Sequence, residues 1–224
     1  MEDGFYKGWT KVSALWNLSL TLLFLTFLSE AWLVGLFILP YVFLVFHYRG
    51  RRGDIHFHWN VPNSLTTCRF LGLVAGFAFS DLMTETTLLI VFGLVLLTDY
   101  FDGFLARKLG QTTKLGEIYD MEADALFVCL LSLHHVLNES LHWLILVPGT
   151  LKYIYALLPV RFTRASDYPP KKVRATIAAT FFIVLLTPFA LNEFWTNLLN
   201  AIAGLLIMYS FGANLFFNLK MIRA

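Results

Sequence analysis

Apolar runs of nearly 20 residues recur along the whole chain, and they limit the folds that the chain can adopt. A run of this length can cross a hydrocarbon core of roughly 30 Å as a helix. Only 14% of the 224 residues are charged, whereas about 25% is usual in soluble domains. The pattern therefore predicts an all-α polytopic membrane protein with about eight spans. The predicted spans are residues 12–28, 31–48, 64–80, 83–106, 115–137, 141–162, 173–191 and 194–217.

The first two predicted spans differ from the others in being short and closely joined, at Ser29 and Glu30. We expect them to form a two-helix membrane hairpin within an N-terminal segment, residues 1–50. The remaining six spans are expected to form a core bundle within residues 51–224.

Positive charge is confined to alternate connections between the predicted spans. Lys and Arg occur near both ends of the chain and after the second, fourth and sixth spans, but not in the connections near Glu30, Asp81, Glu139 and Glu193. By the positive-inside rule, both termini and the connection after the fourth span are expected to face the cytoplasm. This arrangement requires an even number of spans.

Four aspartates lie close together in this apolar chain. Asp99 and Asp102 are three residues apart, and Asp120 and Asp124 are four apart, so on two helices each pair would project from one face. Gly116 falls on the same face as Asp120, where the missing side chain lets backbone or a ligand approach closely. Two facing carboxylate pairs form an oxygen-rich cage suited to Mg²⁺ or Mn²⁺. Carboxylates within membrane helices are costly, so the cage predicts a functional site.

The spacing D-x2-D-G-x2-A-R-x8-G-x3-D-x3-D resembles, at every position, the signature of the CDP-alcohol phosphotransferase family, also called CDP-alcohol phosphatidyltransferases. The matching residues are Asp99, Asp102, Gly103, Ala106, Arg107, Gly116, Asp120 and Asp124. The resemblance implies an integral membrane enzyme with a six-helix core. Such enzymes move a substituted phosphate from a CDP-linked donor to an alcohol and release CMP. It also implies a homodimer, and we expect a bacterial inner membrane or an equivalent one.

The resemblance also implies a role for each motif residue. Asp99, Asp102 and Asp120 are the expected metal ligands, and Asp124 completes the metal site and is the expected general base. The residues expected around the cytidine nucleotide are Gly103, Ala106, Arg107 and Gly116. The alternative is a structural ion network in which the aspartates pair with Arg107, Lys108 and Lys114. Such a network would not require glycine and alanine at fixed offsets.

A second group of basic residues, Arg164, Lys172 and Arg174, follows the sixth predicted span. The resemblance suggests that these residues bind a phosphate carried by the acceptor, as in members that use glycerol phosphate or inositol phosphate. The alternative is that they only set topology and attract anionic lipid.

Three further polar residues lie in or beside predicted spans. Arg69 is six residues into the third span, where it can extend toward the interface or meet an acidic partner. Lys152 lies in the middle of the sixth span, where either a bundle ion pair or a substrate contact would explain it. Asn63 is expected to cap the helix that follows it, with ligand contact as the alternative.

These observations favour a phosphatidyltransferase. Its expected substrates are CDP-diacylglycerol and a small hydroxylated acceptor, with glycerol 3-phosphate or another phosphorylated polyol as the best candidate. The alternative within the family is a choline or ethanolamine phosphotransferase acting on diacylglycerol. The alternatives from other classes are a membrane prenyltransferase and a transporter with acidic helix residues. The aspartate motifs of prenyltransferases are spaced differently and lack G-x2-A-R.

Overall fold

The regular structure of the described chain is entirely helical. The computed structural model describes residues 4–27, 31–49, 59–158 and 168–223, and no strand occurs in these ranges. Short 3₁₀ helices supplement the long ones: η1 (Ala31–Ile38), η2 (Ser80–Leu82), η3 (Trp143–Ile145) and η4 (Thr187–Phe189). The α-helices are α1 (Gly4–Thr26), α2 (Leu39–Arg49), α3 (Val61–Ala78), α4 (Glu85–Lys108), α5 (Lys114–Leu137), α6 (Leu146–Leu157), α7 (Lys171–Val184) and α8 (Glu193–Arg223). The all-α prediction is confirmed.

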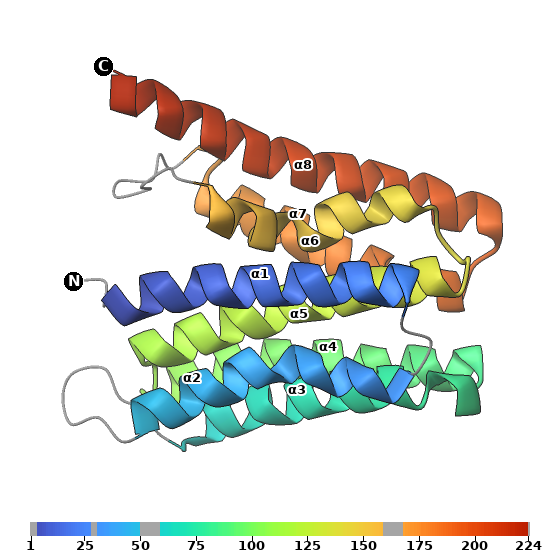
Figure 1. Ribbon diagram of the computed structural model, residues 1–224, viewed down its shortest axis with the longest axis horizontal. Helices are drawn as coiled ribbons and strands as arrows, with labels where there is room; N and C mark the ends of the chain where they lie inside the picture. Colours follow the sequence, from blue (N-terminus) through green and yellow to red (C-terminus); the bar gives the residue numbers. More distant parts are fainter. Residues whose placement is uncertain (1–3, 28–30, 50–58, 159–167, 224) are drawn as a thin grey trace.

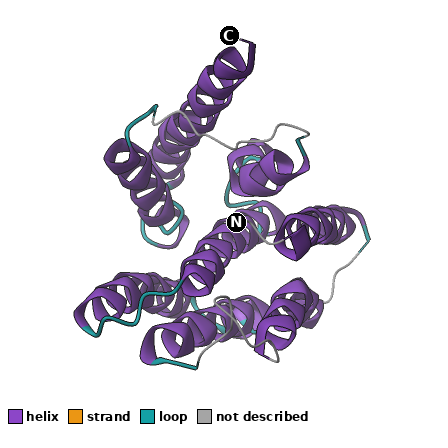
Figure 2. Ribbon diagram, turned by 90° about the vertical axis from the view of Figure 1, so that its left-hand side faces the viewer, coloured by secondary structure: helices purple, strands orange, loops and turns teal. Residues whose placement is uncertain are grey.

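The long helices lie side by side as a bundle, with α1 and α5 between α6–α8 and α2–α4 (Figure 1). Helix α3 packs against α4 and α5, α5 against α6, and α7 against α8. The view in Figure 2, turned by 90°, shows the helix that starts at the N-terminus lying among the other helices. Helix α5 is buried along most of its second half, from Ala125 to His135. It therefore forms the centre of the fold.

The two N-terminal segments form part of the bundle. Helix α1 contacts η1 and α2, as the expected hairpin requires, but it also packs along α6, while η1 packs on α3. The face of α1 turned inward carries buried polar residues four apart, Ser13, Asn17 and Thr21. The Asn17 amide donates to the Tyr41 hydroxyl at 2.9 Å, and that hydroxyl lies 2.9 Å from the Tyr153 hydroxyl of α6. These bonds tie α1 to both neighbours.

The irregular first half of the second segment follows from Pro40. Proline has no backbone N–H, so the carbonyl four residues earlier loses its helical partner. The indole N–H of Trp16 on α1 donates to that carbonyl, at Leu36, at 2.9 Å. Trp9 donates to the Pro40 carbonyl at 2.9 Å. Trp16 thus compensates for the interrupted helix, and both tryptophans fix α1 against it.

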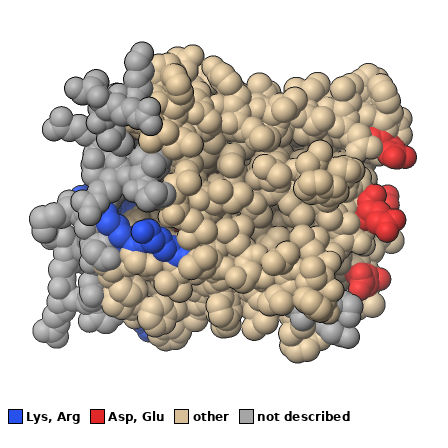
Figure 3. All heavy atoms as spheres, turned by 45° about the horizontal axis from the view of Figure 1, so that its top comes forward, with Lys and Arg blue, Asp and Glu red and all other residues tan. Residues whose placement is uncertain are grey.

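The outer surface has the character of a membrane protein. Large apolar side chains such as Phe27, Phe46 and Leu205 are well exposed, more than is usual for a soluble monomer. On the face shown in Figure 3, acidic side chains lie at one end and Lys and Arg toward the other, with a broad uncharged band between them. Four described segments are long and apolar enough to cross a membrane: Trp32–Arg49, Glu85–Ala106, Lys171–Phe189 and Glu193–Leu219. The protein is an integral membrane protein, and the number of eight crossings stays a prediction.

The close contact of α5 with α6 depends on Gly149. A Cβ atom at this position would lie 2.7 Å from the Cβ of Ser132, closer than packed atoms allow. We expect Gly149→Ala to destabilise the protein by about 1–3 kcal/mol, the usual cost of overpacking. For a chain of this size each kcal/mol lowers the thermal midpoint by about 2–4 °C, measurable in detergent.

Gly93 provides the matched control, because nothing lies within 4 Å of a Cβ at that position on α4. Gly93→Ala is expected to leave the midpoint unchanged or raise it, since alanine is the better helix former. Equal midpoints for the two variants would contradict the packing argument.

Candidate functional site

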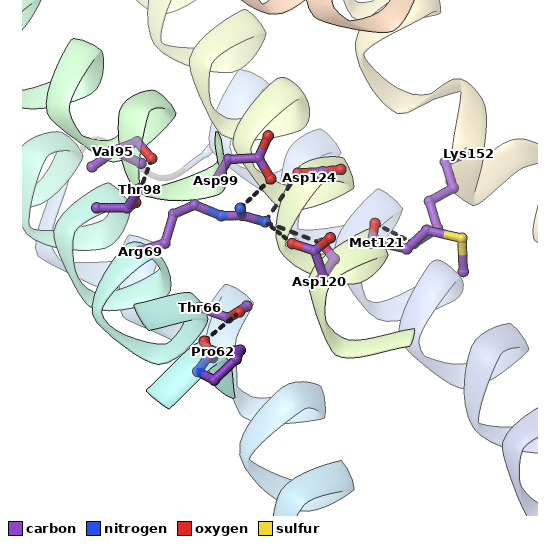
Figure 4. A network of polar contacts seen from close by, with 10 residues as sticks. All are labelled: Pro62, Thr66, Arg69, Val95, Thr98, Asp99, Asp120, Met121, Asp124 and Lys152. Carbon is purple, nitrogen blue, oxygen red and sulfur yellow. Dashed lines mark hydrogen bonds and ion pairs between the residues drawn. The ribbon is translucent and has the colours of Figure 1, made fainter. Parts of the chain in front are cut away.

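Three of the four motif aspartates converge on one arginine. The guanidinium of Arg69 forms ion pairs with Asp99, with Asp120 at 2.8 Å and with Asp124 at 3.0 Å. Figure 4 shows the Arg69 side chain extending from α3 into the space among the three carboxylates. We call Asp99, Asp120 and Asp124 the acidic triad. Its members come from α4 and α5, so the site lies where three helices meet.

Local structure fixes the members of the triad. The Thr113 hydroxyl caps α5 by accepting from the Gly116 N–H at 3.0 Å, and this sets the start of the helix that carries Asp120 and Asp124. The spacing predicted that these two aspartates share one face of the helix. The structure confirms it, since both contact the same guanidinium group. Arg69 is only 3% exposed. The ion pairs confirm the expectation that Arg69 meets an acidic partner. Its burial shows that the side chain does not extend outward to the interface.

The triad has the composition and geometry of a site for a hard cation. One carboxylate oxygen from each residue lies within 4.8 Å of the others, and the side chains are 31%, 39% and 34% exposed, so a ligand can reach them. If all three are ionised, one guanidinium leaves two negative charges uncompensated, which suits a divalent ion. All-oxygen ligation is what Mg²⁺ and Mn²⁺ prefer.

Three of the predicted nucleotide residues surround one cavity beside the triad. Gly103, Ala106 and Gly116 line it together with Asp120, and its volume is about 320 Å³. We call it the polar cavity, because Gln111, Thr112, Thr113, Glu117 and Lys171 also line it. The side chains of Asp102 and Arg107 lie outside the described part of the chain. Their roles stay predictions.

Gly116 has a packing role in this cavity. A Cβ there would lie 2.9 Å from the Thr113 hydroxyl and 3.0 Å from Oδ1 of Asn63. The glycine therefore lets the first turns of α3 and α5 approach, as its predicted close contact required. The expectation that Asn63 caps α3 is wrong: Asn60 is the cap, accepting from the Asn63 N–H at 2.9 Å. Asn63 is buried one turn later and lines the polar cavity.

Lys152 forms the ion pair that was one of its two expected roles. Its ammonium group lies 2.9 Å from Oε1 of Glu122 and donates to the Met121 carbonyl at 2.9 Å. Glu122 is buried on α5 and turned away from the triad toward α6. The pair joins the two helices directly beside Asp124.

The expected acceptor residues are only partly described. Lys172 is exposed and Arg174 half-buried, both in the first turn of α7, while Arg164 lies outside the described residues. Their neighbour Lys171 lines the polar cavity, a position that spacing alone did not reveal. The alternative expectation was an ion network between the aspartates and Arg107, Lys108 and Lys114. Lys108 and Lys114 have exposed side chains. Among the described side chains, the cation that lies between the triad carboxylates is Arg69.

Comparison with known proteins agrees with this geometry. The family model described as CDP-alcohol phosphatidyltransferase matches residues 59–211, which include α3 to α7 and every described residue of the triad. The chain belongs to the CDP-alcohol phosphatidyltransferase family. The resemblance carried by the aspartate motif is thus confirmed. No solved structure gives a significant match.

Several curated relatives of this chain carry more specific names. A CDP-diacylglycerol–glycerol-3-phosphate 3-phosphatidyltransferase of Aquifex aeolicus is 38% identical over 90 residues, which are 38% of this chain and 49% of the relative. One of Wigglesworthia glossinidia brevipalpis is 42% identical over 76 residues, 32% and 41% respectively. A cardiolipin synthase (CMP-forming) of Streptomyces coelicolor is 31% identical over 155 residues, 64% and 72% respectively. The chain spans about half the length of the first two.

The Arg69 contacts predict a stability that depends on divalent ions. Removing the guanidinium with Arg69→Gln leaves three carboxylates facing one another, and a charged hydrogen bond contributes about 1.5–3 kcal/mol. We therefore expect a lower thermal midpoint in chelator than for the wild type, and a larger rise when Mg²⁺ is added. Lys108→Gln, at an exposed lysine on α4, is the control and should match the wild type. Identical midpoints with and without Mg²⁺ in the Arg69 variant would contradict the assignment.

Proposed function

We propose that this phosphatidyltransferase moves the phosphatidyl group of CDP-diacylglycerol to glycerol 3-phosphate or another phosphorylated polyol, with release of CMP. The observation that carries the proposal is the convergence of the acidic triad at the edge of the polar cavity. The names of the Aquifex and Wigglesworthia relatives support glycerol 3-phosphate. A choline or ethanolamine phosphotransferase is less well supported, and so are a prenyltransferase and a transporter.

The proposed cofactor is Mg²⁺ or Mn²⁺. Asp99, Asp102, Asp120 and Asp124 would hold it, and the described three supply oxygens at suitable separations. When bound, such an ion neutralises the charge of a diphosphate and of the departing CMP. Arg69 is paired with all three members of the triad, so its positive charge lowers the net negative charge that an incoming diphosphate meets.

The remaining chemistry is assigned to the protein's own residues. The acceptor oxygen forms a bond to the phosphatidyl phosphorus, while the bond from that phosphorus to the bridging oxygen of CMP breaks. Asp124 takes the proton that leaves the acceptor hydroxyl, and positioned carboxylates serve as such bases. Gly103, Ala106 and Gly116 leave room for the cytidine, and Arg107 is proposed to bind a phosphate oxygen. Binding and orientation lower the barrier by holding both reactants together.

A phospholipid acceptor is the second candidate. It is favoured by the cardiolipin synthase of Streptomyces coelicolor, of which the match covers 72%. Transfer to such an acceptor would use the same donor site and release the same CMP. The two candidates therefore differ only in the part of the site that receives the acceptor.

The proposal places the reaction at the cytoplasmic face of a bacterial inner membrane or an equivalent membrane, and the enzyme as a homodimer. On the face shown in Figure 3, Lys and Arg lie toward one end and the visible acidic side chains at the other. This supports the orientation, because Lys and Arg are enriched on the cytoplasmic side. Division into an N-terminal segment, residues 1–50, and a core, residues 51–224, is part of the same proposal.

CMP release tests the proposed reaction. Purified protein given CDP-diacylglycerol, glycerol 3-phosphate and Mg²⁺ should release CMP; chelator should stop the release, and Mg²⁺ or Mn²⁺ should restore it. Asp124→Asn should lower turnover by about 10²-fold or more, as expected for loss of a general base. Glu85→Gln, at the exposed first residue of α4, is the control with near-normal turnover. Activity that survives thorough chelation, or a fully active Asp124 variant, would refute the mechanism.

The acceptor assignment has its own test. If the phosphate of the acceptor binds at Lys172 and Arg174, Arg174→Ala should raise the KM for glycerol 3-phosphate far more than the KM for the donor. A charged contact of about 1.5–3 kcal/mol corresponds to roughly 10- to 150-fold. Thr180→Ala, on the exposed side of the same helix, should change neither value. If Arg174 and Lys172 variants leave the KM for the acceptor unchanged, these residues do not bind the acceptor and only set topology and attract anionic lipid.

A further inference from the structure

A second cavity meets the acidic triad from the other side. Its volume is about 440 Å³, and its wall includes Asp124 and Lys152. Glu122, the partner of Lys152, and a few hydroxyl-bearing side chains also line it, but most of the lining is apolar, including Val128, Phe181 and Phe211. We call it the apolar cavity. Asp120 lines the polar cavity and Asp124 the apolar one, and the two residues are one helical turn apart on α5.

Helix α1 closes one side of the apolar cavity. Tyr6 and Thr10 line it, and their spacing of four residues places both on one face of the helix. Both residues precede the region that the family model matches, residues 59–211. The wall that they form is therefore supplied by a part of the chain outside the family's domain.

The position of α1 is held by several contacts. Trp9 and Trp16 donate to the Pro40 and Leu36 carbonyls. Asn17 is connected through the Tyr41 hydroxyl to Tyr153, and Tyr153 itself lines the apolar cavity. The helix is thus attached to a residue of the same cavity that Tyr6 and Thr10 face.

The chemistry of the lining identifies the ligand class. A small, fully polar molecule would leave its hydroxyl groups against aromatic rings without partners, which is costly. A hydrocarbon chain attached to a phosphate matches both parts, because the chain lies along the aromatic wall and the phosphate lies at the charged end. The volume falls within the roughly 300–1,000 Å³ of typical ligand sites.

We infer that the apolar cavity binds an acyl chain of a phospholipid substrate, and that Tyr6 and Thr10 of α1 help to select which phospholipid is accepted. The inference rests on the proposed phosphatidyl transfer. The acyl chain can belong to the donor, CDP-diacylglycerol, or to a phospholipid acceptor such as phosphatidylglycerol. In either case α1 is a specificity element and the aspartate motif supplies the chemistry.

Two variants fill the cavity from opposite walls, Thr10→Phe on α1 and Ala178→Phe on α7. Leu15→Phe and Ala179→Phe are their controls, at exposed positions on the same helices. CMP release is measured with dioctanoyl and dioleoyl CDP-diacylglycerol, each with glycerol 3-phosphate or phosphatidylglycerol as acceptor. Thermal midpoints establish that each variant is folded. Phospholipid retained by each purified variant is counted by native mass spectrometry, which does not depend on turnover.

We expect both filling variants to lose roughly 10-fold in kcat/KM for the longer chain, equivalent to about 1.4 kcal/mol. That is the loss expected when about two methylene groups are displaced. Dioctanoyl substrate and both controls should be little affected, and the filling variants should retain less phospholipid. A loss that follows the donor chain identifies the donor as the source, and a loss only with phosphatidylglycerol identifies the acceptor.

Unchanged chain-length preference together with wild-type phospholipid retention in both filling variants would overturn the inference. Failure of the proposed function looks different, because the wild type would then release no CMP with any acceptor. In that case the retention measurement still decides whether the cavity holds an acyl chain.

Discussion

The structure depends on compensating negative charge inside a bundle whose surroundings are apolar. Three partly exposed carboxylates from α4 and α5 meet at one place, and the buried Arg69 of α3 lies among them. A membrane-embedded charge is tolerated when it has a partner or faces a cavity, and here both conditions hold. The packing of α3 against α4 and α5 serves this cluster, with Gly116 allowing the close approach. The fold and the reactive site therefore share the same three helices.

Features set by local sequence were predictable. Asp120 and Asp124 share a face because helix periodicity is a property of neighbouring residues, and eight apolar runs correspond to the observed helical segments. The sequence did argue against Asn63 as the cap of α3, since Pro62 favours the first helical turn and the cap must come before that turn. The partner of Arg69 was not readable. Its aspartates are 30 to 55 residues away, and only the packing of α3 decides which of several acidic groups it meets.

The N-terminal segment shows the same limit. The polar residues Ser13, Asn17 and Thr21 recur every four positions, which indicates that this face of α1 meets protein. The pattern does not identify which helix this face contacts. Packing against the second segment alone, as in the predicted hairpin, would have explained it equally well. In the structure Thr21 lies 3.5 Å from the Cys129 sulfur on α5, and Asn17 reaches α6 through Tyr41. The side chains of α1 thus indicate that this face is buried in protein, whereas the tertiary packing decides which helices it contacts.

The position of α1 has a consequence for biogenesis. This helix is made before α5 and α6, yet Thr21 meets Cys129 across 108 residues and Tyr41 meets Tyr153 across 112. During synthesis the contacts of α1 with α5 and α6 can therefore form only after those helices have been made. Isolated polar side chains in a membrane are prone to find other hydrogen-bond partners. The native partners of Thr21 and Tyr41 thus become available only when residues 108 and 112 positions later have been added.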